Sequence, residues 1–258
     1  MNDLGLAEEQ IQRYSRHILL REIGGEGQKT LLRSSVFVVG AGGLGSAALL
    51  YLAAAGVGKL GVADSDAVEL SNLQRQIIHG TPDIGTSKVY SARKAIARIN
   101  PDCEVHPFPG RLTEETIRLA IRGYDVVLDG SDNFPTRYLV ADSCWAENIP
   151  LVSAAAVRFE GQLLTVLPGK GNPCYRCLYP EPPAEGEAPT CQDAGVLGAV
   201  VGVLGTMQAV EALKLLLGIG KTLSHEILAY DALAHRFITG KRYPNPACPT
   251  CGAAVLFR

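Results

Sequence analysis

The chain has 258 residues, of which 47% are apolar and 19% are charged, so it can bury a sizeable core and lacks the composition of a disordered protein. The formal net charge is −2 and no run of Lys or Arg exceeds two residues, which argues against a nucleic-acid-binding protein. Residues 1–10 carry acids and lack the basic and apolar segments of a secretory signal.

The first part of the chain alternates between helical patterns and short apolar runs. Residues 10–32 form a helical pattern that glycines 24, 25 and 27 interrupt. The predicted strands that follow are residues 36–39, 60–63, 104–108, 125–128 and 151–155, and the predicted helices are 46–55, 88–99, 114–121 and 137–146. This alternation is typical of a Rossmann-like α/β protein with a doubly wound, mostly parallel sheet.

The pattern changes after residue 155. Residues 161–167 form a strand too close to residues 151–155 for a crossover helix, so antiparallel strands continue the sheet. Residues 179–189 are rich in proline and predict an exposed loop. The weakly polar run 194–207 is shorter than the roughly 18 residues of a membrane span, so we read residues 196–217 as a buried helix. Strands near residues 226–230 and 236–239 follow.

The segment from Gly40 to Gly45 fits the GxGxxG pattern between a predicted strand and a predicted helix. Glycine permits a tight turn and a close approach to phosphate, and a helix N-terminus attracts negative charge. Asp64 ends the next strand, where a carboxylate can bind ribose hydroxyls. The alternative is a turn that only lets the helix pack, which assigns no role to Asp64. The pattern therefore favours a nucleotide site.

The choice of nucleotide depends on the residues that follow Asp64. The glycine pattern alone favours NAD or FAD, and no Walker-type loop is present because Ser46 and Ala47 follow Gly45. Arg75 and Lys88 would add two cations near the nucleotide, which suits a triphosphate better than the diphosphate of NAD. As an alternative, both are ordinary solvated helix charges.

Several motifs together resemble the HesA/MoeB/ThiF adenylyltransferases, bacterial relatives of ubiquitin-activating enzymes. They are Arg13-Tyr14-Ser15-Arg16, the loop from Gly40 to Gly45, the segment from Ser71 to Gln76, and the segment from Asp129 to Asn133. The resemblance runs from about Tyr14 to Gly252 and implies ATP with magnesium and a homodimer. The positions that it assigns to the ATP site are Gly43, Asp64, Ser71, Asn72, Leu73, Gln74, Arg75, Lys88, Asp132 and Asn133.

Asp132 and Asn133 follow a predicted strand, at the edge of the sheet where α/β proteins bind their ligands. A carboxylate at this position can hold magnesium against phosphates. The same segment can also cap the helix that carries Pro135 in its first turn. We expect Asn133 to be the cap and Asp132 to be functional.

Four of the seven cysteines form two CxxC pairs, Cys174 with Cys177 and Cys248 with Cys251. Four thiolates complete a closed tetrahedral zinc site that leaves no position for water, so we predict structural zinc that pins the C-terminus to the sheet. Paired CxxC motifs without a secretion signal also indicate a reducing, cytoplasmic location. We read the isolated Cys103 and Cys144 as small buried hydrophobes.

Cys191 and Arg16 are two further candidates for catalysis. Cys191 ends the proline-rich loop before a predicted helix, where a thiol becomes more acidic and more nucleophilic. The resemblance gives this cysteine a role in attacking the adenylate or in sulfur transfer, and it places Arg16 at the ATP of the neighbouring subunit. The alternatives are that Cys191 is an inert loop thiol and that Arg16 is a solvated helix charge.

The resemblance implies a substrate, the C-terminal glycine carboxylate of a small ubiquitin-fold sulfur carrier that ends in Gly-Gly. A carboxylate is already ionised at neutral pH and can attack the α-phosphate without a general base. Arg16, Arg75, Lys88 and magnesium on Asp132 would neutralise the leaving pyrophosphate. We expect one adenylating unit over residues 1–258, with an N-terminal helical segment (1–33), a nucleotide-binding half (34–156) and a carrier-binding, zinc-containing half (157–258).

A sulfur donor is expected to act afterwards as a separate protein, a cysteine desulfurase or a rhodanese, since only seven residues follow Cys251. The pathway, whether molybdopterin, thiamine or tRNA thiolation, is left open. An NAD-dependent oxidoreductase remains an alternative, but it needs neither the zinc set nor the two cations. A carrier-binding scaffold without catalysis is a second alternative, which needs neither Asp132 nor Lys88.

Overall fold

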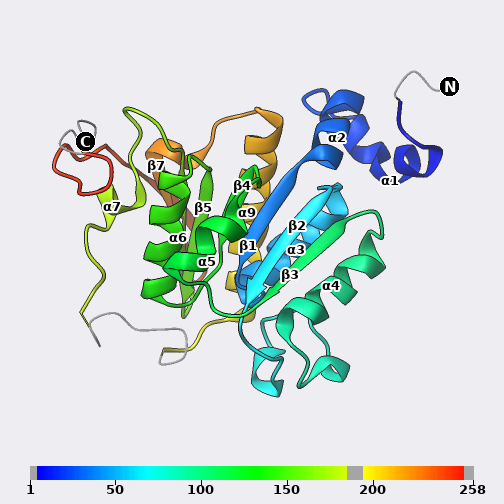
Figure 1. Ribbon diagram of the computed structural model, residues 1–258, viewed down its shortest axis with the longest axis horizontal. Coiled ribbons are helices and arrows are strands. Elements are labelled where there is room, and N and C mark those ends of the chain that lie inside the picture. The colour runs from blue at the N-terminus through cyan, green and yellow to red at the C-terminus, as the bar shows by residue number, and fades with distance from the viewer. Residues whose placement is uncertain (1–4, 185–193, 253–258) are drawn as a thin grey trace.

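The computed structural model describes residues 5–184 and 194–252, and its centre is an eight-stranded mixed sheet (Figure 1). The strand order is β3-β2-β1-β4-β5-β6-β7-β8. The strands are β1 (Ser35–Val39), β2 (Lys59–Asp64), β3 (Glu104–Pro109), β4 (Val126–Asp129), β5 (Leu151–Val157), β6 (Glu160–Val166), β7 (Glu226–Asp231) and β8 (Arg236–Lys241). The first five pair in parallel, and β6, β7 and β8 continue the sheet antiparallel, as predicted.

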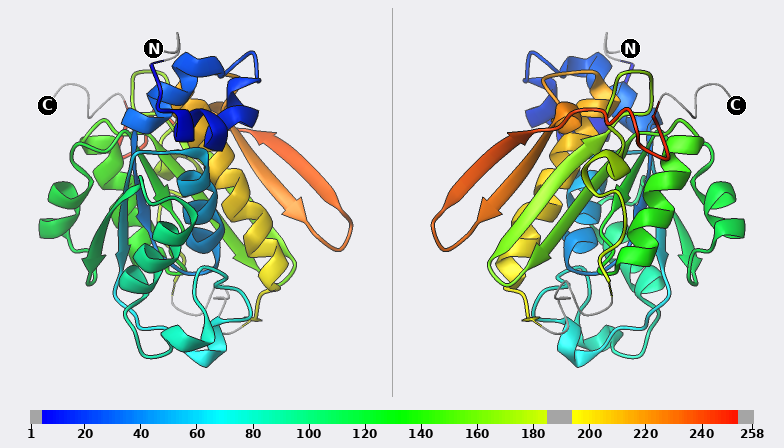
Figure 2. Two further views of the ribbon diagram at one scale, coloured as in Figure 1. Left: turned by 90° about the vertical axis from the view of Figure 1, so that its right-hand side faces the viewer. Right: turned by 90° about the vertical axis from the view of Figure 1, so that its left-hand side faces the viewer.

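Helices cover both faces of the parallel part of the sheet (Figure 2). One apolar core lies between the sheet and three helices, α3 (Gly43–Ala55), α4 (Lys88–Ile99) and α9 (Gly198–Leu217). A second core lies between the other face and α5 (Glu114–Ile121) and α6 (Phe134–Ala146). Because both faces are covered, the residues of β1 and β4 are all buried, which explains their uninterrupted apolar sequences.

The N-terminal helical segment differs from its prediction. It forms two helices, α1 (Glu8–Ile18) and α2 (Gly24–Arg33), so the break falls at residues 19–23 and the three glycines lie inside α2. A Cβ at Gly27 would lie 3.2 Å from Leu217 Cδ2 at the end of α9. We infer that Gly27 serves the packing of α2 on α9 and does not end a helix.

The long helix α9 is the one helix of the described residues that is long and apolar enough, by length and composition, to cross a membrane. In the structure it packs along α3 and against β5 and β6. The polar residues Gln208 and Glu211 of α9 are buried in this interface, where Gln208 Nε2 donates to the backbone oxygens of Asp129 and Val152. A helix bonded to the centre of a sheet in this way is a core helix, as the sequence predicted.

The last two strands form a hairpin that extends away from the helices, as both views in Figure 2 show. Every residue of β8 is exposed, and Tyr230 of β7 stacks on Phe237 of β8 with ring centroids 4.6 Å apart. Short segments connect the remaining elements, namely the 3-10 turns Leu70–Asn72, Thr81–Asp83 and Leu223–His225 and the helix α7 (Tyr175–Leu178).

Candidate nucleotide and metal sites

A cavity of about 1000 Å³ opens at the carboxyl ends of β1 and β4. These neighbouring strands are where the strand order reverses, since β1 has β2 on one side and β4 on the other. Ligands of doubly wound proteins bind at this switch point. The cavity is lined by the glycine loop after β1, the end of β2, the loop after β4, and residues of β5, β6 and β7.

The glycine loop is held in place by contacts that exclude side chains. Gly40 has a φ of +92°, and a Cβ there would lie 3.0 Å from the carbonyl oxygen of Gly130 on the loop after β4. A Cβ at Gly45 would come within 1.8 Å of the Gly40 carbonyl oxygen. A Cβ at Gly42 would have its nearest neighbour at 3.7 Å, so this residue leaves its backbone open to the cavity. Only a glycine-rich sequence fits this turn.

Asp64 and His79 clamp the peptide groups of Ala41 from two sides. Asp64 Oδ2 accepts a hydrogen bond from the Ala41 amide at 2.8 Å, and His79 Nε2 lies 2.9 Å from the Ala41 carbonyl oxygen. His79 Nδ1 lies 2.8 Å from the hydroxyl of Ser91. Burial lowers the pKa of His79, so the ring is a neutral Nε2–H donor. The sequence suggested that a glycine turn serving only helix packing would leave Asp64 without a role. This was wrong, because Asp64 holds the turn through the Ala41 amide.

The carboxylate of Asp64 lies at the cavity with most of its surface covered. Burial raises the pKa of Asp64, while Lys88 and the amides of Asp66 and Ala41 oppose this shift. Lys88 itself is only 5% exposed, and its Nζ lies 2.8 Å from Asp66 Oδ2. The Lys88 ammonium thus pairs with Asp66 and acts electrostatically on Asp64 at the cavity wall, and it is not a solvated helix charge.

The structure brings six of the ten predicted ATP-site residues to the cavity wall: Gly43, Asp64, Arg75, Lys88, Asp132 and Asn133. Arg75 Nη1 donates to the Ser71 carbonyl oxygen, which ties the guanidinium to the preceding 3-10 turn. The other four, Ser71, Asn72, Leu73 and Gln74, form this turn and its continuation but do not border the cavity. Within the described chain they support Arg75.

In the loop after β4, the predicted capping by Asn133 is confirmed, and the functional role of Asp132 stays a prediction. Asn133 Oδ1 accepts from the Thr136 amide at 3.0 Å and caps α6. Asp132 is exposed at the cavity. Among the described residues, its side chain has one hydrogen-bond partner, the side-chain Nδ2 of Asn133, which lies 3.4 Å from Asp132 Oδ1. Its carboxylate oxygens therefore retain free lone pairs that face the cavity.

Arg16 and Cys191 are the two remaining predicted site residues. Arg16 is exposed on α1 and does not border the cavity of its own chain. Cys191 lies outside the described residues. The thiols of Cys103 and Cys144 are buried, as predicted, and burial raises the pKa of Cys103 to about 12, so it is an unreactive thiol.

The cavity also includes polar residues that the sequence did not single out, namely Gln76, Arg111, Arg137, Ser153, Gln162, Tyr175 and Tyr179. Gln76 is part of the segment quoted for the resemblance, and only its position in the motif could have marked it. The others come from α6, β5, β6 and α7 and from the segments that follow β3 and α7, and they follow no spacing rule. Their convergence depends on the three-dimensional fold.

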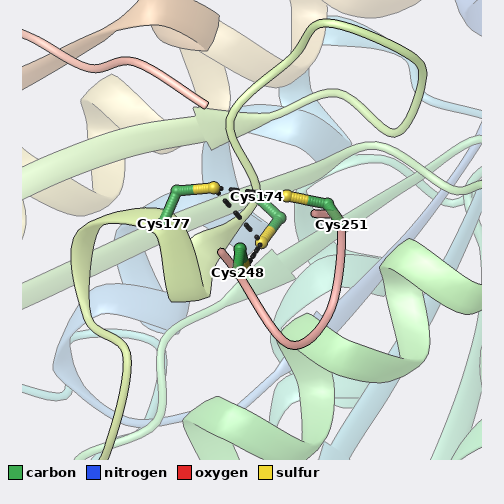
Figure 3. Close-up of side chains that lie close together, drawn as sticks. All are labelled: Cys174, Cys177, Cys248 and Cys251. Carbon is green, nitrogen blue, oxygen red and sulfur yellow. Dashed lines mark hydrogen bonds between the residues drawn. The ribbon is translucent and has the colours of Figure 1, made fainter. Parts of the chain in front are cut away.

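The four CxxC cysteines converge, and their sulfur atoms all lie within 4.8 Å of one another (Figure 3). The recorded Sγ–Sγ distances are 3.8 Å for Cys174–Cys177, 3.4 Å for Cys174–Cys248 and 3.2 Å for Cys177–Cys251. Sulfurs at about 2.3 Å from a tetrahedral zinc ion lie about 3.8 Å apart. The cluster thus has the size and donor set of a closed Cys₄ metal site.

Polar contacts tie this cluster to the sheet and to α6. Arg242, which follows β8, donates to the carbonyl oxygens of Thr165, Pro173 and Cys174. Arg176, between the first two cysteines, forms a two-pronged ion pair with Asp142 of α6. The cluster therefore connects the C-terminal CxxC segment to both β6 and α6, and Tyr175 beside it reaches the cavity.

The fold and these features define a doubly wound α/β protein with a ligand cavity at its switch point and a four-cysteine metal-site candidate. The chain belongs to the ThiF family, whose model matches residues 14–250. The resemblance deduced from the sequence motifs is thereby confirmed.

Two relatives are similar to this chain over nearly their full length. The "SAMP-activating enzyme E1" of Haloferax volcanii is 51% identical over 249 residues, which cover 96% of this chain and 92% of the relative. The "Sulfur carrier protein adenylyltransferase" of Thermus thermophilus is 49% identical over 251 residues, with 95% and 92% coverage.

Two other matches also cover 96% of this chain, but this chain spans a smaller share of each of them. The "Adenylyltransferase and sulfurtransferase MOCS3" of Bos taurus is 50% identical over 96% of this chain, which spans only 54% of that protein. Among solved structures, Escherichia coli MccB with ATP has a TM-score of 0.81 over 96% of this chain and 76% of MccB. At 22% identity, this likeness supports the fold alone.

Proposed function

We propose that this protein is an adenylyltransferase that uses ATP to activate the C-terminal glycine of a small ubiquitin-fold sulfur carrier. The observation that carries the proposal is the cavity at the switch point, where Arg75 and Lys88 join the glycine loop and Asp132. The two relatives matched over nearly their full length are named for the activation of SAMP and the adenylylation of a sulfur carrier protein, which supports the same activity. An NAD-dependent oxidoreductase is not favoured by these names or by the two cations.

The reaction joins the carrier carboxylate to the α-phosphorus of ATP and breaks the bond to the β-phosphate oxygen, giving an acyl-adenylate and pyrophosphate. The carboxylate oxygen supplies the electron pair, and pyrophosphate leaves with the pair of the broken bond. Arg75 and Lys88 stabilise the charge that develops on the leaving group. Backbone N–H groups of Gly42 and of the N-terminus of α3 donate hydrogen bonds to phosphate oxygens, and Asp64 accepts hydrogen bonds from ribose hydroxyls.

The residues present fit both metals that we propose. Asp132, exposed at the cavity with free carboxylate oxygens, would hold magnesium, which neutralises phosphate charge when bound. Cys174, Cys177, Cys248 and Cys251 would hold structural zinc, because four thiolates fill its coordination sphere. Burial raises the pKa of the Cys174 thiol, and a bound cation would favour the thiolate.

We assign the two halves of the chain separate tasks within one adenylating unit. Residues 34–156 hold the nucleotide, and residues 157–258 receive the carrier, with Gln162, Tyr175 and Tyr179 at their common cavity. We propose a cysteine desulfurase or a rhodanese as a separate sulfur donor, and in support the SAMP-activating enzyme and the sulfur carrier protein adenylyltransferase are named for activation alone, whereas MOCS3 is also named a sulfurtransferase. Molybdopterin, thiamine and tRNA thiolation are the candidate pathways in the cytoplasm.

A homodimer would complete the active site with Arg16 from the second subunit. In support, α3 and α9 pack together and expose Tyr51 (57%) and Val210 (50%), and the segment after α1 exposes Leu19 (73%). Cys191 would act after adenylation, as a nucleophile toward the adenylate or in sulfur transfer. Cys191→Ala should then leave adenylation intact and slow thiocarboxylate formation, and unchanged rates in both assays would remove Cys191 from the mechanism.

Pyrophosphate exchange tests the function directly. Purified protein with ATP, magnesium and a ubiquitin-fold carrier ending in Gly-Gly should incorporate labelled pyrophosphate into ATP. The same carrier without its final glycine serves as the control and should give no exchange. If no carrier supports exchange and the protein instead oxidises NADH with a small substrate, the oxidoreductase alternative replaces this proposal.

A further inference from the structure

Asp129, the last residue of β4, forms a buried ion pair with Arg137 of α6 beneath the loop that carries Asp132. Asp129 is fully buried, and the side chain of Arg137 is 11% exposed. Arg137 Nε lies 3.5 Å from Asp129 Oδ2. Burial opposes the charge of Arg137, but Asp129 together with Tyr175 and Tyr179 outweighs it, so the pKa of Arg137 is raised and the guanidinium remains charged.

Both residues bind the backbone of Ser131, the residue immediately before Asp132. Asp129 Oδ1 accepts hydrogen bonds from the Ser131 amide at 3.0 Å and from its hydroxyl at 2.6 Å. Arg137 Nη2 donates to the Ser131 carbonyl oxygen at 2.7 Å. The two peptide groups that flank Ser131 are therefore fixed from opposite sides by one charged pair.

The pair is itself anchored to the neighbouring elements. Asp129 Oδ2 accepts from the hydroxyl of Ser153 on β5 at 3.0 Å, and Gln208 of α9 donates to the Asp129 carbonyl oxygen. Arg137 Nε, in contrast, is buried without a hydrogen-bond partner among the described residues, although Arg137 borders the cavity. A buried ion pair is weak evidence of a role in stability, since replacing it by an apolar pair of similar size often leaves the stability unchanged.

We propose that the Asp129–Arg137 pair is a positioning device that sets the orientation of Asp132 toward the magnesium–triphosphate, and this rests on the function proposed above. Among the described residues, the exposed side chain of Asp132 has one long contact, at 3.4 Å, and no strong anchor of its own. The rigid part of its loop is Ser131. Arg137 and Asp129 thus act through Ser131, as outer groups commonly orient metal ligands.

The test compares Arg137→Lys with Ser131→Ala and a matched control, Glu211→Gln. Lysine keeps the charge but cannot both bind the Ser131 carbonyl and pair with Asp129 in the same planar geometry. Ser131→Ala removes the 2.6 Å bond without placing an unpaired charge in the core. Glu211 is the control because it is buried, like Ser131, but does not border the cavity. Its carboxylate accepts hydrogen bonds from the Thr165 hydroxyl and from the Leu223 amide.

Two readouts are measured: the magnesium concentration for half-maximal exchange, and the extra rise in Tm that ATP with magnesium gives over ATP alone. Arg137→Lys should raise the magnesium requirement about tenfold and remove most of the extra rise in Tm, with Ser131→Ala changing both in the same direction. Glu211→Gln should lower the Tm of the free protein and leave both magnesium readouts unchanged.

Equal magnesium requirements for Arg137→Lys, Ser131→Ala and wild type would overturn the inference, as would an equal shift in Glu211→Gln. If Arg137→Lys does not fold, Ser131→Ala decides the outcome alone. A failure of the proposed function is distinguishable, because it would appear as absence of exchange in the wild-type protein with every carrier.

Discussion

The ammonium of Lys88, the first residue of α4, lies 2.8 Å from the carboxylate of Asp66, and Lys88 is buried while the Asp66 side chain is 64% exposed. This asymmetry makes the pair a poor stabiliser, since an exposed partner is well hydrated by itself. Burial raises the pKa of Asp64, and the same ammonium opposes this rise. Lys88 is therefore a cation held at the cavity, available to a more highly charged ligand.

Replacing Lys88 should remove activity with little effect on the fold. We expect Lys88→Met to lower the rate of pyrophosphate exchange about a hundredfold to a thousandfold, because one preorganised cation at the phosphates is lost. Methionine retains the buried stem, and Asp66 remains solvated. Lys94→Met is the control, because Lys94 lies on the same helix, 72% exposed and 3.8 Å from Asp83. Similar losses in both variants would contradict the assignment of Lys88.

Asp132 and Asn133 should separate activity from stability. Asp132→Ala is expected to abolish magnesium-dependent exchange while leaving the free energy of unfolding unchanged, because the side chain is exposed and weakly bonded. Asn133→Ala should instead lower the free energy of unfolding by about 1 kcal/mol, because the Thr136 amide loses its cap. Chemical denaturation and exchange assays on both variants check this. Destabilisation by Asp132→Ala alone would reverse the two roles.

The sequence predicts most of the fold because strands buried on both faces are uninterrupted apolar runs, and β1 and β4 are of this kind. Helix starts were less well predicted. Helix α3 begins at Gly43 and not at residue 46, because Gly43 and Gly45 form its first turn. The prediction missed this turn because glycine has a low helix propensity. Helix α6 begins at Phe134, directly after its cap, and not at residue 137.

The candidate site was predicted where local motifs supply it, as with Gly43, Asp64 and the four cysteines. It was missed where it depends on packing between elements. In the sequence, Arg137 is an ordinary helix residue. Only the packing of α6 beside β4 brings it to Asp129. In the same way, no spacing rule relates Tyr175 near the cysteines to the glycine loop, although both border one cavity.

The four-cysteine cluster should contain one zinc ion per chain in freshly reduced protein. Cys248→Ser is expected to remove zinc and lower the Tm by more than about 5 °C, because a closed site contributes its binding energy to folding. Cys103→Ala, which removes an isolated buried thiol, is the control and should retain zinc. Elemental analysis and thermal unfolding measure both effects. Reduced wild-type protein without bound metal would refute the zinc assignment.

His79 should make stability depend on pH. Its pKa in the folded state is lowered from 6.5 by burial, so below this pH the unfolded chain binds a proton that the folded protein does not. The stabilisation from neutral His79 is present above pH 6.5 and is lost as the pH falls. The difference in unfolding free energy between wild type and His79→Gln should therefore shrink between about pH 7.5 and about pH 5.5, by up to about 1.4 kcal/mol per unit. A difference that is constant over this range would argue against a neutral, buried His79.

The last prediction concerns Arg16, which is exposed on α1 and has no ion pair with any residue that the structure describes. If Arg16 completes the site of a neighbouring subunit, Arg16→Ala should abolish exchange, whereas Arg13→Ala should not. Arg13 lies on the same helix, and its guanidinium donates to the Ile99 carbonyl oxygen at 2.8 Å. This pair of variants separates a catalytic cation from a structural one.

Mixing subunits then tests whether Arg16 acts across the dimer. Homodimers of Arg16→Ala and of Lys88→Met should both be inactive. In a mixed dimer, the site of the Arg16→Ala subunit retains its own Lys88 and receives Arg16 from the other chain, so half of the sites should recover exchange. If Arg16 acts within its own chain, every site lacks one cation and the mixture stays inactive. With subunit exchange verified by native mass spectrometry, absence of recovery rules out a shared site, since both cations would then be required on the same chain.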